Sequence, residues 1–132
     1  MVLDTSALLA IYFSEPDSER FEAAIVGAPE SVISAGTLLE AGIVVEARRG
    51  KAGSVELDRL LRQLGVRTVP VDAEQVEVGR VAFRTYGRGR HPAALNYGDC
   101  FAYALAITTS DRLLFKGDDF SKTDVVDALA DP

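Results

Sequence analysis

The chain opens with Met1-Val2-Leu3-Asp4-Thr5-Ser6-Ala7-Leu8, in which a short apolar run ends at an acid and passes at once into a helical pattern. The run predicts a buried strand over Val2 to Asp4. The residues after it predict a helix over Ser6 to Ser14 with Thr5 as its N-cap. Because α/β sheets bind their ligands outside the carboxyl ends of their strands, Asp4 lies where such a sheet would place its ligand.

Strand-like and helix-like stretches alternate along the rest of the chain. Strands separated by helices predict a short, mostly parallel central sheet with helices on both faces, a three-layer α/β/α sandwich. We expect a single domain over residues 1–132, because the chain shows neither an internal repeat nor a linker. The further strands are expected at 31–34, 66–71 and 113–115, and the further helices at 17–26, 37–49, 54–64, 73–86 and 97–108.

The amino-acid composition argues against a membrane-spanning protein and against a zinc protein. The chain has 132 residues, 48% of them hydrophobic, but no apolar run approaches the length of a membrane span, and no basic leader precedes one. We therefore expect no membrane partner. The single cysteine suits a reducing, cytoplasmic location. One cysteine and one histidine are too few for a dedicated His/Cys zinc site within one chain.

Further acids fall where apolar residues would be expected. Glu40 lies inside an apolar helical stretch, Asp99 opens another, and Asp118 and Asp119 follow the last clear strand. Helical spacing puts Glu40 on one face with Ile43 and Val44, and Asp99 on one face with Ala102, Tyr103 and Ile107. Both acids are therefore expected to point with the core-facing residues. Together with Asp4 they predict one acidic pocket at the carboxyl edge of the sheet.

Such a pocket favours a particular chemistry. Oxygen ligands alone select Mg²⁺ or Mn²⁺, and these ions activate water and stabilise charge on a phosphoryl group. A metal-dependent phosphodiesterase is the most economical interpretation. Two alternatives stay open: a phosphoacceptor or phosphatase domain that uses Asp4 itself, and a non-catalytic binding module. Taken singly, the acids also have structural explanations, as helix caps, turn residues or an ion-paired Glu40.

Arginines recur every four residues at Arg80, Arg84 and Arg88, and Arg90 follows them, although the net charge is −6. The predicted helix ends near Tyr86, which places Arg88 and Arg90 in a loop. Two interpretations stay open, a solvated arginine face and a track that contacts phosphates.

Four stretches together resemble the PIN-domain ribonucleases of the VapC toxin type, over nearly the whole chain. The carriers are Val2 to Leu8, Glu40, Asn96 to Cys100, and Leu113 to Phe120 with Thr123-Asp124. The resemblance implies a PIN-like fold and a Mg²⁺-dependent endoribonuclease, with Mn²⁺ as an alternative ion. It also implies a small antitoxin that blocks the acidic pocket, a toxin homodimer and toxin–antitoxin hetero-oligomers.

The same resemblance implies roles for single residues. Asp4 and Asp99 match the metal-binding acids, and Glu40 matches the acid that completes the pocket or orients the water. The fourth acid matches Asp119, with Gly117 where many relatives have a first Asp, so Asp118 stays an alternative and the number of metal ions stays open. Thr5, Ser6 and Asn96 match polar positions near the pocket and are expected to support it with hydrogen bonds. Apart from the resemblance, if the arginine track binds RNA, Arg84, Arg88 and Arg90 would hold the flanking phosphates.

Two expectations concern surfaces. The stretches Leu8 to Phe13, Phe21 to Val26 and Leu57 to Leu64 are rich in apolar residues, which predicts a groove for an amphipathic helix of the partner. Tyr86 and Tyr97 are interpreted as packing residues rather than as platforms on which bases stack.

Overall fold

The computed structural model describes residues 1–131, and Pro132, the last residue of the predicted domain, lies outside the described residues. Its strands are β1 (Val2–Leu3), β2 (Ser31–Ser34), β3 (Val66–Val69) and β4 (Leu113–Leu114). They pair in parallel in the order β3-β2-β1-β4, with Val2 opposite both Val32 and Leu113. The predicted parallel sheet is confirmed, although three of its strands end one or two residues earlier than expected.

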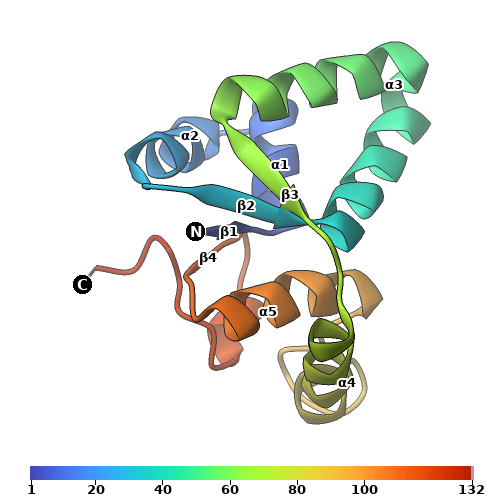
Figure 1. Ribbon diagram of the computed structural model, residues 1–132, viewed down its shortest axis with the longest axis vertical. Helices are drawn as coiled ribbons and strands as arrows, with labels where there is room; N and C mark the ends of the chain where they lie inside the picture. Colours follow the sequence, from blue (N-terminus) through green and yellow to red (C-terminus); the bar gives the residue numbers. More distant parts are fainter. Residues whose placement is uncertain (132) are drawn as a thin grey trace.

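Helices cover both faces of this sheet. They are α1 (Thr5–Tyr12), α2 (Ser18–Gly27), α3 (Ala35–Leu64), α4 (Ala73–Tyr86) and α5 (Tyr97–Thr109), with a short 3₁₀ turn, η1 (Phe120–Lys122). Figure 1 shows α1, α2 and α3 on one side of the sheet and α4 and α5 on the other, which confirms the three-layer sandwich. Within residues 1–131, no helix combines the length and the apolar character needed to cross a membrane.

The sheet divides the core because successive strand residues point to opposite faces. Leu3, Ile33 and Leu114 pack against α1, α2 and α3, while Val2 and Leu113 pack against α5. All five side chains are completely buried. Strands this short and this apolar are typical of a sheet covered on both sides.

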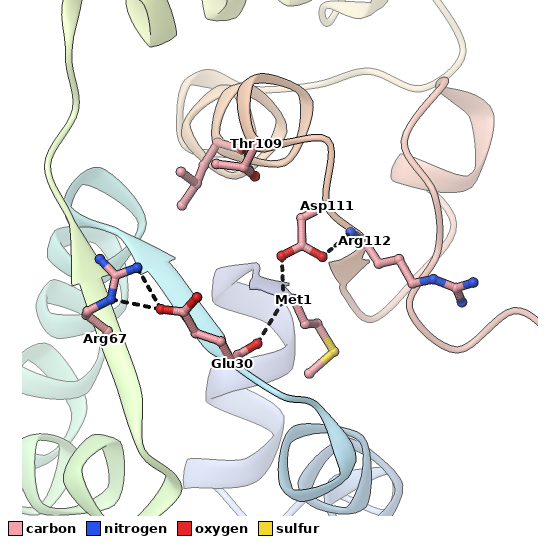
Figure 2. A network of polar contacts seen from close by, with 7 residues as sticks. Met1, Glu30, Arg67, Thr109, Asp111 and Arg112 are labelled. Atoms are coloured by element: carbon pink, nitrogen blue, oxygen red, sulfur yellow. Dashed lines mark hydrogen bonds and ion pairs between the residues drawn. The ribbon is translucent and has the colours of Figure 1, made fainter.

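The amino ends of the strands are tied together by polar contacts on the edge opposite to Asp4. The ammonium group of Met1 donates to the Glu30 carbonyl and pairs with the Asp111 carboxylate, and Arg67 pairs with the Glu30 side chain (Figure 2). Glu30 precedes β2, Arg67 lies in β3 and Asp111 precedes β4. These contacts fasten the start of β1 to its neighbours.

One local prediction is wrong, and another is confirmed. Asp4, not Thr5, is the N-cap of α1: its side chain accepts a hydrogen bond from the backbone N–H of Ser6, and Thr5 is already helical. The two helices predicted at 37–49 and 54–64 are confirmed as the two arms of α3, which is kinked between them. Gly50 interrupts it with φ +66° and ψ −164°, a backbone conformation almost confined to glycine.

Two predictions about apolar faces are also corrected. In the three stretches expected to form a partner groove, most large apolar side chains are core, because α1, α2 and the second half of α3 cover one face of the sheet. These are Leu8, Ile11, Phe21, Ile25, Leu57 and Leu61. Ile43, expected to face the core with Glu40, is 61% exposed. The buried stripe of this part of α3 is Thr37, Ala41 and Val45, each four residues from the next.

Candidate active site

The strand order marks the carboxyl end of β1 as the place where an α/β sheet of this kind binds its ligand. The chain leaves β1 towards β2 on one side, and β4 is added on the other side, which makes this end a topological switch point. Asp4 directly follows β1, α3 begins directly after β2, and the segment that carries Asp118 and Asp119 follows β4. The first turn of α5 reaches the same edge, because Gly98 lies against the Glu40 carboxylate.

Asp4 is buried, and only one of its two carboxylate oxygens accepts hydrogen bonds. Its Oδ2 accepts hydrogen bonds from the Ser6 backbone N–H at 3.0 Å and from the Ser6 hydroxyl at 2.6 Å, while its buried Oδ1 has no partner. The Ser6 hydroxyl oxygen in turn accepts from the Lys116 backbone N–H at 2.9 Å. Burial raises the pKa of Asp4, the Ser6 hydrogen bonds oppose this rise, and the nearby Glu40 charge adds to it.

Glu40 is held from two sides. The Thr5 hydroxyl donates to Glu40 Oε1 at 2.6 Å. On the other side, a Cβ atom placed on Gly98 would overlap the Glu40 carboxylate. The absence of a side chain at Gly98 therefore lets α5 approach α3 closely enough to bring Glu40 near Asp99.

Asp99 and Asn96 form a capping box at the start of α5. The Asn96 side chain accepts from the Asp99 N–H at 3.0 Å, and Asp99 Oδ2 accepts from the Asn96 N–H at 2.9 Å. The pKa of Asp99 is raised to about 6, chiefly by burial and also by the charges of Asp4, Glu40 and Asp119, while the Asn96 hydrogen bond lowers it. The four acids therefore lie close enough to interact through their charges.

Asp118 and Asp119 lie exposed in the turn before η1. Asp119 contributes to the raised pKa of Asp99. Asp118 accepts a hydrogen bond from the Ser121 hydroxyl through its backbone carbonyl. Gly117 has φ +93°, which favours glycine where many relatives are expected to carry Asp. The turn is anchored on the core, because the buried Phe120 ring packs against Phe115, with the ring centroids 5.4 Å apart.

The donor set fits a hard divalent cation in its chemistry. As the side chains stand within residues 1–131, no three of them already form a group that could hold a metal ion. One oxygen each of Asp4, Glu40 and Asp99 is fixed by Ser6, Thr5 and Asn96. The unpartnered Asp4 Oδ1 is the strongest sign of a missing ligand, since an unsatisfied buried acceptor costs about 1–3 kcal/mol. All of these donors are carboxylate oxygens, which suit Mg²⁺ or Mn²⁺.

The predicted arginine track is brought together only in part. Arg84 and Arg90, joined by Arg80, line a groove of about 770 Å³ between α4 and α5, whereas the exposed Arg88 is not part of its lining. Tyr97 lines the same groove and is 80% exposed, so its interpretation as a packing residue is wrong. The reason is its place at the first position of α5, outside the buried stripe that begins at Gly98.

The PIN-domain family model matches residues 1–126. The chain belongs to the PIN-domain family. Within that family it is similar to the VapC ribonucleases: it is 51% identical over 125 residues to Ribonuclease VapC30 of Mycobacterium tuberculosis, an alignment that covers 95% of each chain.

Solved structures show the same fold. Mycobacterium tuberculosis VapC20, a sarcin–ricin loop cleaving toxin, matches this PIN domain with a TM-score of 0.76 and 17% sequence identity over 95% of each chain. A toxin–antitoxin complex from Klebsiella pneumoniae matches with a TM-score of 0.72 and 16% identity over 96% of each chain. The predicted PIN-like fold is therefore confirmed.

Sequence reasoning missed two supports of the site. One is the cradle that Gly98 provides for Glu40. Its signal in the sequence is a glycine in the first turn of a helix, a position where almost any other residue would stabilise the helix more than glycine does. The other is the hydrogen bond from the Tyr103 hydroxyl to Asp124 Oδ1 at 2.7 Å, which ties the chain after η1 to α5. That pair is 21 residues apart in sequence and has no local signature.

Proposed function

We propose that this PIN domain is a Mg²⁺-dependent endoribonuclease, the toxin of a toxin–antitoxin pair, and that it acts in the cytoplasm. The observation that carries the proposal is the buried, unpartnered oxygen of Asp4 within a group of four interacting acids. The similarity to Ribonuclease VapC30 supports RNA as the substrate.

Each acid has its own role in the proposed reaction. Asp4 and Asp99 would hold the ion, Glu40 would complete the pocket or orient the attacking water, and Asp119 is favoured over Asp118 as the fourth acid because its charge acts on Asp99. When bound, Mg²⁺ or Mn²⁺ lowers the pKa of a water molecule and offsets charge on the scissile phosphate. Ser6, Thr5 and Asn96 each hold one carboxylate in orientation.

The two alternative functions, a phosphoacceptor or phosphatase domain and a non-catalytic binding module, have less support. A phosphoacceptor aspartate must be reached by a phosphoryl group, but Asp4 is 4% exposed and its Oδ2 already accepts two hydrogen bonds. A binding module has no need to gather acids whose burial and mutual repulsion raise the pKa of Asp99. The arrangement is economical only if the acids serve a cation.

We assign the antitoxin to the exposed apolar residues of α3. Leu39 is 66% and Ile43 61% exposed, and they flank Glu40 on the same helix. An amphipathic helix lying there would end close to the acids, where a basic side chain would neutralise them. The Klebsiella toxin–antitoxin complex supports such a partner. A homodimer and a toxin–antitoxin hetero-oligomer stay predictions, which sedimentation with and without the antitoxin would test.

The test is cleavage of total RNA by the purified chain with Mg²⁺, with Mn²⁺ and with a chelator, using Asp99→Asn as the control. We expect cutting that requires the ion and that the variant lacks. Asp99→Asn keeps the shape of the side chain, so its circular dichroism spectrum should match the wild type. Wild-type rates of cutting by a folded Asp99→Asn protein would overturn the proposal.

A further inference from the structure

We propose that the α4–α5 groove is a subsite for unpaired bases of the RNA next to the scissile phosphate, with Tyr97 as the surface on which a base stacks. This inference rests on the proposed function. It adds a site for bases to the proposed catalytic centre, whose acids would act on the phosphate backbone of the substrate.

Two aromatic side chains of the groove are exposed to solvent. Tyr97 is 80% and Phe83 40% exposed, although both are large apolar rings. The Tyr97 and Phe101 rings pack edge to face, with their planes 84° apart and their centroids 5.0 Å apart. Phe101 itself fits closely over Gly36 of α3, which supports the Tyr97 ring from behind. A supported, solvent-facing aromatic ring offers the flat apolar face on which unstacked bases pack.

The charged residues that line the groove are all arginines. They are Arg80, Arg84 and Arg90, and within residues 1–131 no acid belongs to the lining, in a chain with a net charge of −6. The Arg90 guanidinium lies 5.8 Å from the centroid of the Phe83 ring, while Arg80 pairs with Glu77 beside the groove. Arginines interleaved with aromatic rings match a nucleic-acid single strand, which presents phosphates and base faces in alternation.

One residue of the groove, Tyr97, lies near the acids, because its neighbour Gly98 rests against the Glu40 carboxylate. Tyr97 directly follows Asn96, the residue that orients Asp99, and it stands at the first position of α5. A strand with its scissile phosphate near Asp4 and Asp99 would thus place a neighbouring base at Tyr97, because successive nucleotides lie only a few ångströms apart. The α4 side of the groove, with Arg84, would then face the next phosphate.

A second copy of the chain fits this groove less well. In a two-fold dimer the same patch meets itself. A groove-to-groove contact would bring Arg84 and Arg90 against the same arginines of the other copy, and no acid within residues 1–131 lines the groove to pair with them, whereas Arg80 already pairs with Glu77. The charge of RNA complements the groove, whereas the charge of an identical groove opposes it. An interface between protein copies is therefore the competing outcome of the test.

The test uses a short single-stranded RNA that carries 2-aminopurine, with a chelator present so that nothing is cut. Stacking on Tyr97 should quench the probe in the wild type and in Tyr97→Phe, and Tyr97→Ala should lose the quenching. Affinity for Tyr97→Ala should fall about 5- to 100-fold, the range for one base–aromatic stack. With Mg²⁺, the same variant should raise KM more than it lowers kcat. Val26→Ala, an exposed apolar residue on α2, is the matched control and should behave as the wild type.

Each outcome decides one question. Unchanged quenching and affinity in Tyr97→Ala would overturn the subsite. So would a wild-type dimer that Tyr97→Ala turns into a monomer in sedimentation, since the groove would then be a protein interface. If the wild type shows no Mg²⁺-dependent cleavage but Tyr97-dependent quenching persists, the proposed nuclease function fails and the RNA-binding groove stands.

Discussion

The Glu40 carboxylate rests against the backbone of Gly98, and this contact predicts a variant that folds but does not cut. A methyl group in Gly98→Ala would overlap the carboxylate, and the flexible end of Glu40 would move away rather than the helix. We expect cleavage to fall at least 10-fold, as for other losses of support around a metal site. The melting temperature should hold, because alanine favours the helix by about 1 kcal/mol over glycine. Gly42→Ala, where a Cβ meets nothing within 4 Å, is the control and should keep full activity.

The sequence predicts which residues carry the chemistry better than it predicts how they are held. Asp4, Glu40 and Asp99 stand out because an acid among apolar residues is costly without a purpose. Whether Thr5 or Asp4 caps α1 depends on a difference of one residue, and the structure gives the cap to Asp4 and the Glu40 contact to Thr5. The close approach of Gly98 joins two helices distant in sequence, so its local signal, a glycine in the first turn of a helix, does not reveal that Glu40 is the partner.

Among the elements, α5 couples its own stability to the site, because Asn96 both caps the helix and orients Asp99. Asn96→Ala should cost about 1 kcal/mol of unfolding free energy, the usual effect of losing an N-cap, and should also impair cleavage. Asp72→Ala is the matched control, since Asp72 caps α4 by accepting from the Gln75 N–H at 2.9 Å. Chemical denaturation should show similar losses for the two variants, and only Asn96→Ala should cut RNA poorly. Equal activity of the two would contradict the role given to Asn96.

The limits of the helices follow from the sequence where a cap or a glycine marks them. Asp72 and Tyr86 bound α4 as expected, and Gly50 separates the two arms of α3 as expected. The exposure of helix faces was harder to predict. A strip of apolar residues indicates that a helix is covered, but only the packing decides that α1 and α2 cover the sheet while Leu39 and Ile43 stay exposed.

At the scale of the whole molecule, the negative charges of the site acids destabilise the folded chain. The pKa of Asp99 is raised from 3.8 to about 6, and burial raises that of Asp4 in the same direction. A carboxyl group whose pKa is higher in the folded than in the unfolded chain binds its proton more tightly when folded. Its stabilising effect is therefore complete below pH 3.8 and is lost as the pH rises through about 6.

This linkage gives a stability difference that depends on pH and on the ion. Without metal at pH 7, Asp99→Asn should be more stable than the wild type by about 1 kcal/mol, after allowance for the partial exposure of Asp99, which is about 4 °C in Tm. The difference should shrink as the pH is lowered towards 4, since the wild-type carboxyl group then becomes protonated. Mg²⁺ at pH 7 should also reduce the difference in stability, because the ion stabilises only the wild type. Thermal melts of both proteins in chelator, across pH and with Mg²⁺, would measure it. A difference that is constant with pH would mean that Asp99 does not titrate in this range, and the physical case for a strained acidic pocket would fail with it.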